Sequence, residues 1–225
     1  MLANNIANSS SSGFKADREF YSLYAAPEAT SAASDPAQLP VIERHWTDFS
    51  QGALRMTGNP LDLALNGDGF FAASSPSGAV YTRNGVFHLS PGGELQTQDG
   101  YPVLGQDGKS IKLDRSKDVE FGPDGTVRQQ GQVVSQLALV QFQDLTKLNK
   151  AGHAYFQSSD PDVKPGNAAR IKVEQGAAED ANATPAEAAV RLVSVMRQFE
   201  MLQKALTLGV EMNRQAFAEV AKVGG

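Results

Sequence analysis

The sequence predicts an α+β fold in which a central antiparallel β-rich domain stands between an N-terminal helix remnant and a long C-terminal helix of coiled-coil type. Glycine-containing turn dipeptides concentrate in the middle of the chain, with short runs of strand-forming residues between them. Apolar residues near the C-terminus repeat with heptad spacing instead. The predicted segments are the N-terminal helix end with its turn, a linker or loop, the β-rich domain and the C-terminal helix, at residues 1–24, 25–40, 41–175 and 176–225.

Turn chemistry marks the β-rich domain. Of the 21 glycines, 14 fall between Gly52 and Gly131. The longest run of strand formers, Val133–Phe142, predicts a longer and more buried strand. Six dipeptides are of the hairpin type and are expected to supply the positive φ that tight turns need, namely Asn66-Gly67, Asp68-Gly69, Asn84-Gly85, Asp99-Gly100, Asp107-Gly108 and Asp124-Gly125.

A long helix is predicted from Thr184, which suits the N-cap, while Pro185 suits the first helical position and Glu187 the third. Such a helix of ~35 residues would extend about 50 Å. Its polar seam positions favour a specified register in an assembly. Alternating steps of four and three give a seam with seven apolar positions out of nine, at Leu192, Met196, Phe199, Gln203, Leu206, Val210, Asn213, Phe217 and Val220.

The predicted seam needs a partner along much of its length. Residues 1–8 form the only other helix-like stretch near a terminus, cover only about 12 Å and would be marginal as an isolated helix. Other subunits, or residues upstream of Met1, would have to supply the remaining contacts. The alternative is a helix that packs on its own β domain. The length and narrowness of the seam favour association.

Composition excludes several classes of protein. The 225 residues are 41% hydrophobic and carry a net charge of −5, which argues against a basic nucleic-acid-binding domain. No apolar run predicts a membrane span, and the N-terminus lacks the features of a Sec-type signal peptide. The absence of Cys excludes disulfides, thiolate metal sites and cysteine nucleophiles. It fits a chain that stays unfolded during export, although many cytosolic proteins also lack Cys.

Patterns that would carry catalysis are weak. Ser12 and Lys15 match S-x-x-K, but the glycine and serines around them predict a loop rather than the helix which that chemistry needs. The histidines lie far apart without metal-ligand spacing, and no turn aspartate belongs to a calcium loop. We therefore predict no catalytic residue, metal, cofactor or small-molecule substrate. Four aromatic residues could form a sugar-stacking platform, although core packing is commoner, namely Trp46, Phe49, Tyr81 and Phe87.

Several stretches, taken together, resemble one family, the bacterial flagellar rod and hook–basal-body proteins. The run Ala3–Asn8, followed by Gly13–Asp17, is similar to that family's Asn-rich helix end and Gly-Phe-Lys turn. The runs Gln51–Phe71 and Tyr81–Gly105 are similar to its central motif and to the segment that follows. The C-terminal helix resembles the family's terminal helix, most clearly over Arg197–Met201.

The resemblance implies an architecture and a role. In this family the N- and C-terminal helices pair into an axial core domain, and a β-rich domain forms an outer layer. The chain would be a structural, non-enzymatic subunit of the flagellar basal-body rod, polymerising helically into part of the drive shaft for motility. Its partners would be copies of itself and neighbouring rod and hook–basal-body subunits, with no nucleic acid and no membrane insertion. It would cross the periplasm within the rod, after unfolded type III export without a cleavable signal peptide.

Two features depart from the family pattern. Members usually carry further residues before the Ala-Asn-Asn segment, so that this chain would begin inside the helix. The segment before the C-terminal helix keeps only Asn182 of the usual Ser-Asn-Val stretch. The sequence Arg-Gln-Phe-Glu that starts at Arg197 resembles the proximal-rod type more than the distal-rod type, which usually has Gln-Arg-Ala-Tyr at this point.

Subunit packing is predicted at both ends of the chain. The amides of Asn4, Asn5 and Asn8 would satisfy polar groups at the helix end. Gly13 would permit the turn, and Phe14 would anchor it in apolar contacts. The seam residues would pack against neighbouring helices. The alternative function is a secreted β-domain carbohydrate-binding protein or hydrolase with a helical stalk, which requires a concave site with convergent carboxylates or aromatic rings.

Overall fold

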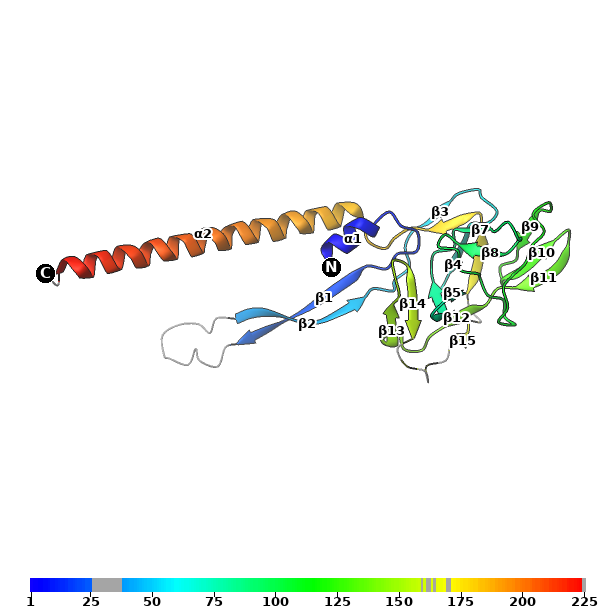
Figure 1. The fold of residues 1–225 in the computed structure, drawn as a ribbon, viewed down its shortest axis with the longest axis horizontal. Helices are drawn as coiled ribbons and strands as arrows, with labels where there is room; N and C mark the ends of the chain where they lie inside the picture. The colour runs from blue at the N-terminus through cyan, green and yellow to red at the C-terminus, as the bar shows by residue number, and fades with distance from the viewer. Residues whose placement is uncertain (26–37, 159, 161–162, 164, 169–170, 224–225) are drawn as a thin grey trace. The chain divides into compact units, whose positions relative to one another are not determined.

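Strands fill the chain between two α-helices in the computed structural model (Figure 1). The structure describes every residue except 26–37, 159, 161–162, 164, 169–170 and 224–225. The chain divides into two compact units: a β-rich unit of residues 3–183 with Met1, and a helical unit of residues 184–225 with Leu2. The α+β class predicted from the sequence is confirmed.

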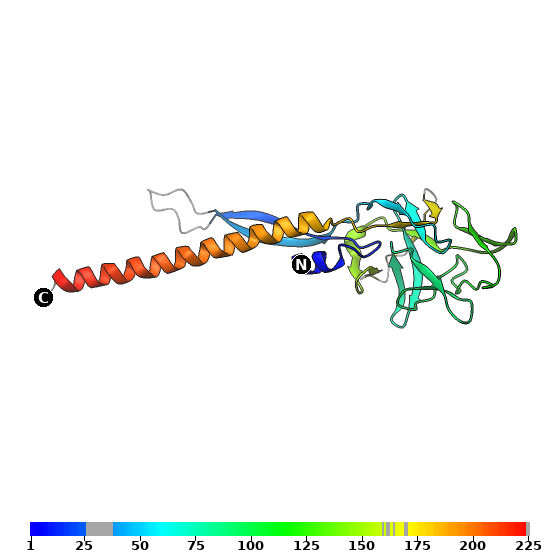
Figure 2. The same ribbon diagram turned by 90° about the horizontal axis from the view of Figure 1, so that it is seen from above.

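The helices begin where their sequences indicate. Helix α1 spans Leu2–Asn8, and helix α2 spans Pro185–Val223, which is 39 residues or about 58 Å. The hydroxyl oxygen of Thr184 accepts a hydrogen bond from the backbone nitrogen of Glu187 at 3.3 Å, as expected of an N-cap. Helix α2 runs without interruption in both views (Figures 1 and 2). No helix in the described part of the chain combines the length and apolar character that a membrane crossing requires.

A two-stranded antiparallel ribbon follows α1, and its strands pair only with each other among the described strands. It consists of β1 (Asp17–Ala25) and β2 (Gln38–Thr47). Strand β1 extends across the predicted boundary at 24/25, and β2 extends across the one at 40/41. Residues 17–24 are rich in aromatic and alternating polar residues, which favour a strand over a helix end. The rest of the predicted linker, residues 26–37, lies outside the described residues.

The largest sheet has six antiparallel strands in the order β13-β14-β6-β5-β12-β15. Strands distant in sequence are neighbours here: β6 pairs with β14, and β5 pairs with β12. Its strands are β5 (Phe70–Ser75), β6 (Gly78–Thr82), β12 (Leu139–Gln141), β13 (Leu148–Lys150), β14 (Tyr155–Ser158) and β15 (Gly166–Asn167). A short 3-10 helix, Leu145–Lys147, precedes β13.

Smaller sheets complete the unit. Three of them are antiparallel pairs, and one has three strands in the order β11-β10-β9. The predicted boundary at 175/176 cuts this unit, because the last strand lies beyond it. The pairs are β3 (Leu54–Met56) with β17 (Ala177–Glu179), β4 (Leu63–Asn66) with β16 (Lys172–Gln175), and β7 (Phe87–Leu89) with β8 (Leu95–Thr97); the triplet is β9 (Val119–Phe121), β10 (Thr126–Gln129) and β11 (Gln132–Gln136).

The run Val133–Phe142 is not the single buried strand that the sequence predicts. It is divided between β11, at the edge of the three-stranded sheet, and β12, inside the six-stranded sheet. Val133 and Val134 are 63% and 47% exposed, whereas Leu137 and Leu139 are buried. The chain changes sheets at this point, and a hydropathy pattern along the sequence does not reveal such a change.

Two hydrophobic clusters form most of the core. The larger one gathers aliphatic residues around Leu63, Leu65 and Phe71. The second is aromatic: the Phe70 ring lies edge-on to Phe142, and Phe49 packs against the same group. Buried side chains of this kind each stabilise the fold by roughly 1.5–3 kcal/mol. The two clusters support the turns that carry the buried charged residues described below.

The six hairpin-type dipeptides serve two purposes. Gly67, Gly100, Gly108 and Gly125 adopt positive φ, as predicted. Gly69 and Gly85 do not, so the prediction is wrong there. A Cβ atom at Gly85 would overlap the carbonyl oxygen of Leu63, and one at Gly69 would overlap the Ile171 side chain. These two glycines are required by close approach of neighbouring chain segments rather than by φ.

Candidate functional site: a buried ionic junction and an exposed helix

Three charged side chains meet inside the β-rich unit, and together they form what we call the ionic junction: Lys15, Arg83 and Glu179. The carboxylate of Glu179, at the end of β17, lies 2.6 Å from Lys15 Nζ and 3.1 Å from Arg83 Nε. The side chains of Lys15 and Glu179 are fully buried, and that of Arg83 is 2% exposed. Such an enclosed triad joins segments from the start, the middle and the end of the unit.

The backbone completes the junction. Gly52 donates its N–H to Glu179 Oε1 at 2.9 Å, and Lys15 Nζ also donates to the carbonyl oxygen of Ser50. Arg83 Nη1 donates to the carbonyl oxygens of Gly67 and Gly69, both at 2.7 Å. Glu179 Oε2 accepts no hydrogen bond from the described residues and relies on the ion pair with Arg83. The turns around Ser50 and Gly67 are thereby tied to β17.

Electrostatics make this a structural site. Burial lowers the pKa of Lys15, and the Glu179 carboxylate opposes that shift. Burial lowers the pKa of Arg83 in the same way, again opposed by Glu179. Two cations share one carboxylate, so the triad carries a net charge of +1. No atom of Lys15 or Glu179 is open to a substrate, and the ammonium that the S-x-x-K pattern would assign to Ser12 is bound elsewhere.

The turn before Lys15 fits tightly against the middle of the chain. Gly13 has φ +68° and donates its N–H to the carbonyl oxygen of Glu179 at 2.7 Å. A Cβ atom at Gly13 would overlap the backbone of Asn84. Phe14 is 1% exposed, and Lys150 Nζ, from β13, lies 4.6 Å from the centre of its ring. The chain turns at Gly13 with a positive φ, and this turn packs within the chain.

We expect Gly13→Ala to destabilise the β-rich unit more than Gly58→Ala. Gly58 has φ +75° with nothing within 4 Å of its built Cβ, so alanine there costs only the strain of positive φ, about 1–2 kcal/mol. At Gly13 the overlap with Asn84 adds about 1–3 kcal/mol. Urea unfolding of both variants measures the difference, and equal losses would contradict the close fit.

Asparagine amides bind the backbone on both sides of the junction. Asn5 and Asp17 exchange two hydrogen bonds, from Asn5 Nδ2 to the Asp17 carbonyl oxygen at 2.8 Å and from the Asp17 N–H to Asn5 Oδ1 at 3.0 Å. Asn8 Nδ2 donates to the Asn4 carbonyl oxygen at 2.9 Å. Asn182 accepts from the Ala16 N–H and donates to the Asp48 carbonyl oxygen, both at 2.7 Å. The Asn4 side chain is exposed.

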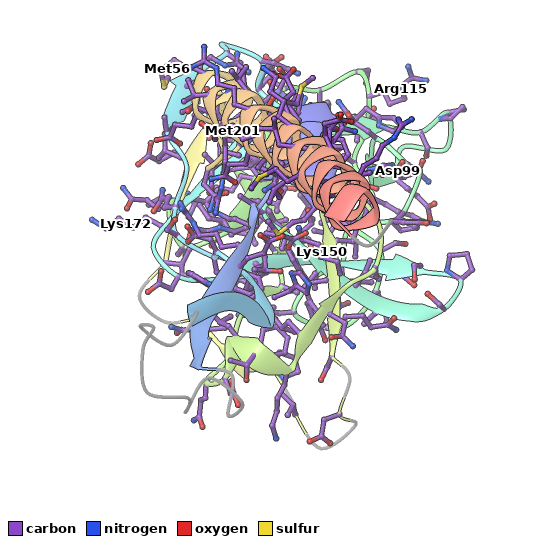
Figure 3. The ribbon with its side chains drawn as sticks, turned by 90° about the vertical axis from the view of Figure 1, so that its left-hand side faces the viewer. Met56, Asp99, Arg115, Lys150, Lys172 and Met201 are labelled. Atoms are coloured by element: carbon purple, nitrogen blue, oxygen red, sulfur yellow. The ribbon has the colours of Figure 1, made fainter. Side chains whose placement is uncertain are left out.

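Two further ion pairs involve the residues that follow Lys15. Lys150, labelled in Figure 3, lies 2.7 Å from Asp17 Oδ1 and donates to the Lys15 carbonyl oxygen at 2.8 Å. On the other side, Arg18 Nε lies 2.7 Å from Asp48 Oδ2, and the Ser50 N–H donates to Asp48 Oδ1 at 3.0 Å. The segment around Lys15 is held by side chains from both β13 and the end of β2.

Asp48 gives the unit a defined dependence on pH. Burial alone would raise the pKa of Asp48, but hydrogen bonds from Ser50 and the Arg18 guanidinium hold the pKa below its ordinary value of 3.8. This contribution is complete above pH 3.8 and disappears as the pH falls through the lower pKa of the folded state. We expect Asp48→Asn to be less stable at pH 7 and to lose less stability between pH 5 and pH 2, measured by urea unfolding. An unchanged acid profile would contradict this.

The predicted seam lies on exposed surface. Phe199, Leu206 and Val210 are 60%, 71% and 68% exposed, and Leu192 and Met196 are 39% and 56% exposed. Gln203 is also exposed. The side chains of the last three predicted seam residues lie outside the described set, namely Asn213, Phe217 and Val220. Packing against other subunits stays a prediction for all of these residues.

The aromatic residues considered as a sugar platform do not come together. Phe87 belongs to the aliphatic cluster, Tyr81 to the aromatic one, and Phe49 packs against Phe70. Trp46 is 47% exposed at the end of β2. The platform interpretation is therefore wrong, since three of the four rings fill the core. Among the described residues, no three His, Cys, Asp or Glu side chains are grouped to hold a metal ion.

Comparison with known proteins connects this arrangement to one family. The family model described as flagellar hook protein FlgE/F/G D1 domain matches residues 64–134, and that described as flagellar basal body rod FlgEFG protein C-terminal matches residues 174–218. The flagellar basal-body rod protein FlgF of Caulobacter vibrioides is 33% identical over 99% of this chain and 91% of the relative. The chain belongs to the flagellar basal-body rod protein family.

Further relatives agree with that assignment. The FlgF protein of Mesorhizobium japonicum is 30% identical over 88% of this rod protein and 81% of the relative. The FlgG protein of Buchnera aphidicola subsp. Schizaphis graminum is 31% identical over 94% and 90%. The family resemblance is confirmed, and the FlgF relatives support the preference for the proximal-rod type. The chain is thus a structural subunit of the bacterial flagellar basal-body rod.

Pattern reasoning missed most of the ionic junction of this rod protein. Arg83 falls in the first family match and Glu179 in the second, while Lys15 lies outside both. Lys15 and Arg83 occur in runs that carry the resemblance, but a charged residue in a turn segment is usually solvated. The pairing of β17 with β3 places Glu179 opposite Leu54, and the Gly13 N–H donates to the Glu179 carbonyl oxygen. The sequence offered one signal for the buried charges: Lys15 follows Gly13 closely, and Arg83 precedes the Asn84-Gly85 turn.

Proposed function

We propose that this rod protein polymerises helically with copies of itself and with neighbouring rod and hook–basal-body subunits, forming part of the drive shaft that crosses the periplasm. The observation that carries the proposal is the apolar seam of α2, whose described apolar members are 39–71% exposed in the single chain. An exposed stripe of this length is typical of a surface that another chain covers.

The ionic junction suits a subunit that transmits force in such a shaft. Helix α2 begins at Pro185, five residues after Asp180, and the chain passes from the β-rich unit to the helical unit between residues 183 and 184. Glu179 and Asn182 tie this part of the chain to Lys15 and Ala16, just before β1, and to Asp48, just after β2. Lys150 of β13 bonds in turn to the Lys15 carbonyl oxygen. Load that enters the β-rich unit at residue 184 would thus be shared by the segments that flank β1 and β2.

The proposal extends to the absence of catalysis and to the route of export. The role is non-enzymatic and uses no cofactor, which agrees with the structural part that the family plays. The chain is exported unfolded, through the flagellar apparatus and without a cleaved signal peptide. The absence of Cys supports this route, since no disulfide has to form or break on the way.

Mass spectrometry of purified hook–basal bodies from the source bacterium tests the proposal. The expected result is peptides of this chain together with the other rod subunits, and an N-terminal peptide that shows no signal-peptide cleavage. Basal bodies that hold the other rod subunits without this chain would overturn the rod assignment. A processed N-terminus would overturn the export proposal alone.

A further inference from the structure

Two Asn-Gly dipeptides of the β-rich unit carry a reactivity that the rod role does not use. The backbone nitrogen of the residue after an asparagine can attack Cγ of the asparagine side chain. Glycine favours this attack, because it has no Cβ atom to prevent a close approach of its backbone. The two dipeptides are Asn66-Gly67 and Asn84-Gly85. Their surroundings in the folded chain are different.

Asn66 and the nitrogen that follows it are held only by surface contacts. Asn66, the last residue of β4, is exposed, and its Nδ2 donates to Glu174 Oε1 of β16 at 3.0 Å. The Gly67 N–H donates to Gln51 Oε1 at 3.3 Å, also at the exposed surface. Water competes for hydrogen bonds of this kind, so they contribute little. Both reacting groups can therefore be released without opening the sheet.

Asn84-Gly85 is fixed on both sides. The Asn84 N–H donates to Thr82 Oγ1 at 2.9 Å, and Asn84 Oδ1 accepts from the Val86 N–H at 3.1 Å. The Gly85 carbonyl oxygen accepts from the Leu63 N–H at 2.9 Å, and a Cβ atom at Gly85 would overlap the Leu63 carbonyl oxygen. Leu63 belongs to β4 and is buried. Rearrangement of this dipeptide therefore requires β4 to move away.

We propose that Asn66 is a site of spontaneous deamidation in the folded chain and that the structure protects Asn84. The Gly67 nitrogen loses its proton to water and bonds to Asn66 Cγ, while the bond from Cγ to the side-chain nitrogen breaks. That nitrogen takes up a proton and leaves as ammonia. One water molecule then opens the five-membered imide at either carbonyl carbon, which gives aspartate or isoaspartate. Water is the only co-reactant, and the chain gains one negative charge.

The isoaspartate product reaches the ionic junction through the backbone. In this product the main chain runs through the former side-chain carbon and is one atom longer just before Gly67. The Gly67 carbonyl oxygen accepts one of the two 2.7 Å hydrogen bonds from Arg83 Nη1, so the longer backbone displaces a partner of a buried cation. The aspartate product keeps the backbone unchanged and lies opposite Lys172 of β16, where an opposite charge is tolerated.

Peptide mapping by mass spectrometry measures the two sites separately. Trypsin cuts after Arg55, Arg83 and Lys109, which places Asn66 and Asn84 in different peptides. The purified full chain is incubated in mildly alkaline buffer, once folded and once in urea. In the folded chain we expect Asn66 to deamidate at least about tenfold faster than Asn84, which reacts only after local opening. Similar rates at both sites of the folded chain, or no reaction at Asn66, would overturn the proposal.

Two controls assign the difference to the structure. In urea we expect Asn66 and Asn84 to react at similar rates, and a difference that persisted there would overturn the protection of Asn84 by the fold. Asn59 lies in the same tryptic peptide as Asn66, but it precedes Pro60, whose nitrogen has no proton to lose. We expect no deamidation at Asn59 while Asn66 reacts. Equal reaction at Asn59 would overturn the mechanism.

The effect on the ionic junction needs a variant of matched charge. Asn66→Asp carries the charge of the product without the additional backbone atom. The isoaspartate form is recovered from the incubated chain, and its identity is checked by enzymatic methylation of the isoaspartyl carboxylate. We expect this form to unfold at a lower urea concentration than Asn66→Asp. Equal midpoints would overturn the coupling between the backbone at residue 66 and Arg83.

Discussion

Replacing Glu179 with glutamine is expected to lower the free energy of unfolding of the β-rich unit by about 3–5 kcal/mol. The carboxylate is the sole anion of the ionic junction and faces both Lys15 and Arg83 at 2.6 and 3.1 Å. Glutamine leaves the two buried cations with only the weaker coulombic influence of Asp48 on Lys15 and of Asp68 on Arg83, and breaking a buried pair in this way costs more than the pair contributes. Urea unfolding followed by circular dichroism measures the loss.

Lys15→Met supplies the informative control. Removal of the Lys15 charge leaves Arg83 and Glu179 as a balanced pair, and Glu179 Oε1 keeps its hydrogen bond from Gly52 at 2.9 Å. The expected loss is about 1–3 kcal/mol, the cost of one buried hydrogen-bonding group left unmatched. The decisive result is that Glu179→Gln loses more stability than Lys15→Met. This difference is expected because the triad of Lys15, Arg83 and Glu179 carries a net charge of +1. Equal losses would mean that packing, rather than charge, dominates the site.

Asp180→Asn controls for the loss of a carboxylate in the next residue. Asp180 pairs with Arg55 at 3.1 Å, but the two side chains are 43% and 57% exposed. Exposed pairs of this kind contribute about 0–1 kcal/mol because water and salt screen them. A loss at Asp180 that matched the loss at Glu179 would show that burial does not set the importance of the junction.

The fold class was predictable because its evidence is local. Turn dipeptides and heptad spacing are properties of neighbouring residues, and they located the strands and the start of α2 at Pro185. The ribbon of β1 and β2 was missed, since the segment from Asp17 was assigned to the helix end by its position in the chain. The division of Val133–Phe142 between two sheets was missed because sheet membership depends on distant partners.

The junction could not be predicted for the same reason. Lys15 and Glu179 are separated by 164 positions, and nothing near either residue in sequence indicates that it is buried. The turn glycine next to Lys15 was predictable, because a positive φ is a local requirement that Gly13 meets at +68°. The seam was predictable as a pattern, whereas its partner is a property of the assembly.

A carboxylate in the middle of the seam is expected to abolish rod incorporation and motility without unfolding the chain. Phe199 is 60% exposed in the single chain, so Phe199→Asp removes no core contact of the monomer. In the assembly the same position would be buried, and the variant loses about 1.5–3 kcal/mol of apolar burial and adds an unpaired charge that costs several kcal/mol more. Because 1.4 kcal/mol is already tenfold in an equilibrium, incorporation should fall by more than about tenfold.

Comparison with Lys204→Asp distinguishes the loss of an apolar seam contact from the effect of an added negative charge. Lys204 lies on α2 about 120° around the helix from Leu192 and is exposed, and its replacement changes the net charge by more than Phe199→Asp does. If assembly depends on apolar seam contacts, Phe199→Asp has the larger effect although it changes the net charge less. We expect Lys204→Asp to restore swimming to a strain that lacks the protein, and Phe199→Asp not to do so. Urea unfolding of the β-rich unit should be unchanged in both. Equal motility of the two variants would place the subunit contact on another surface, because a buried carboxylate at position 199 cannot be tolerated in a dry helix–helix contact.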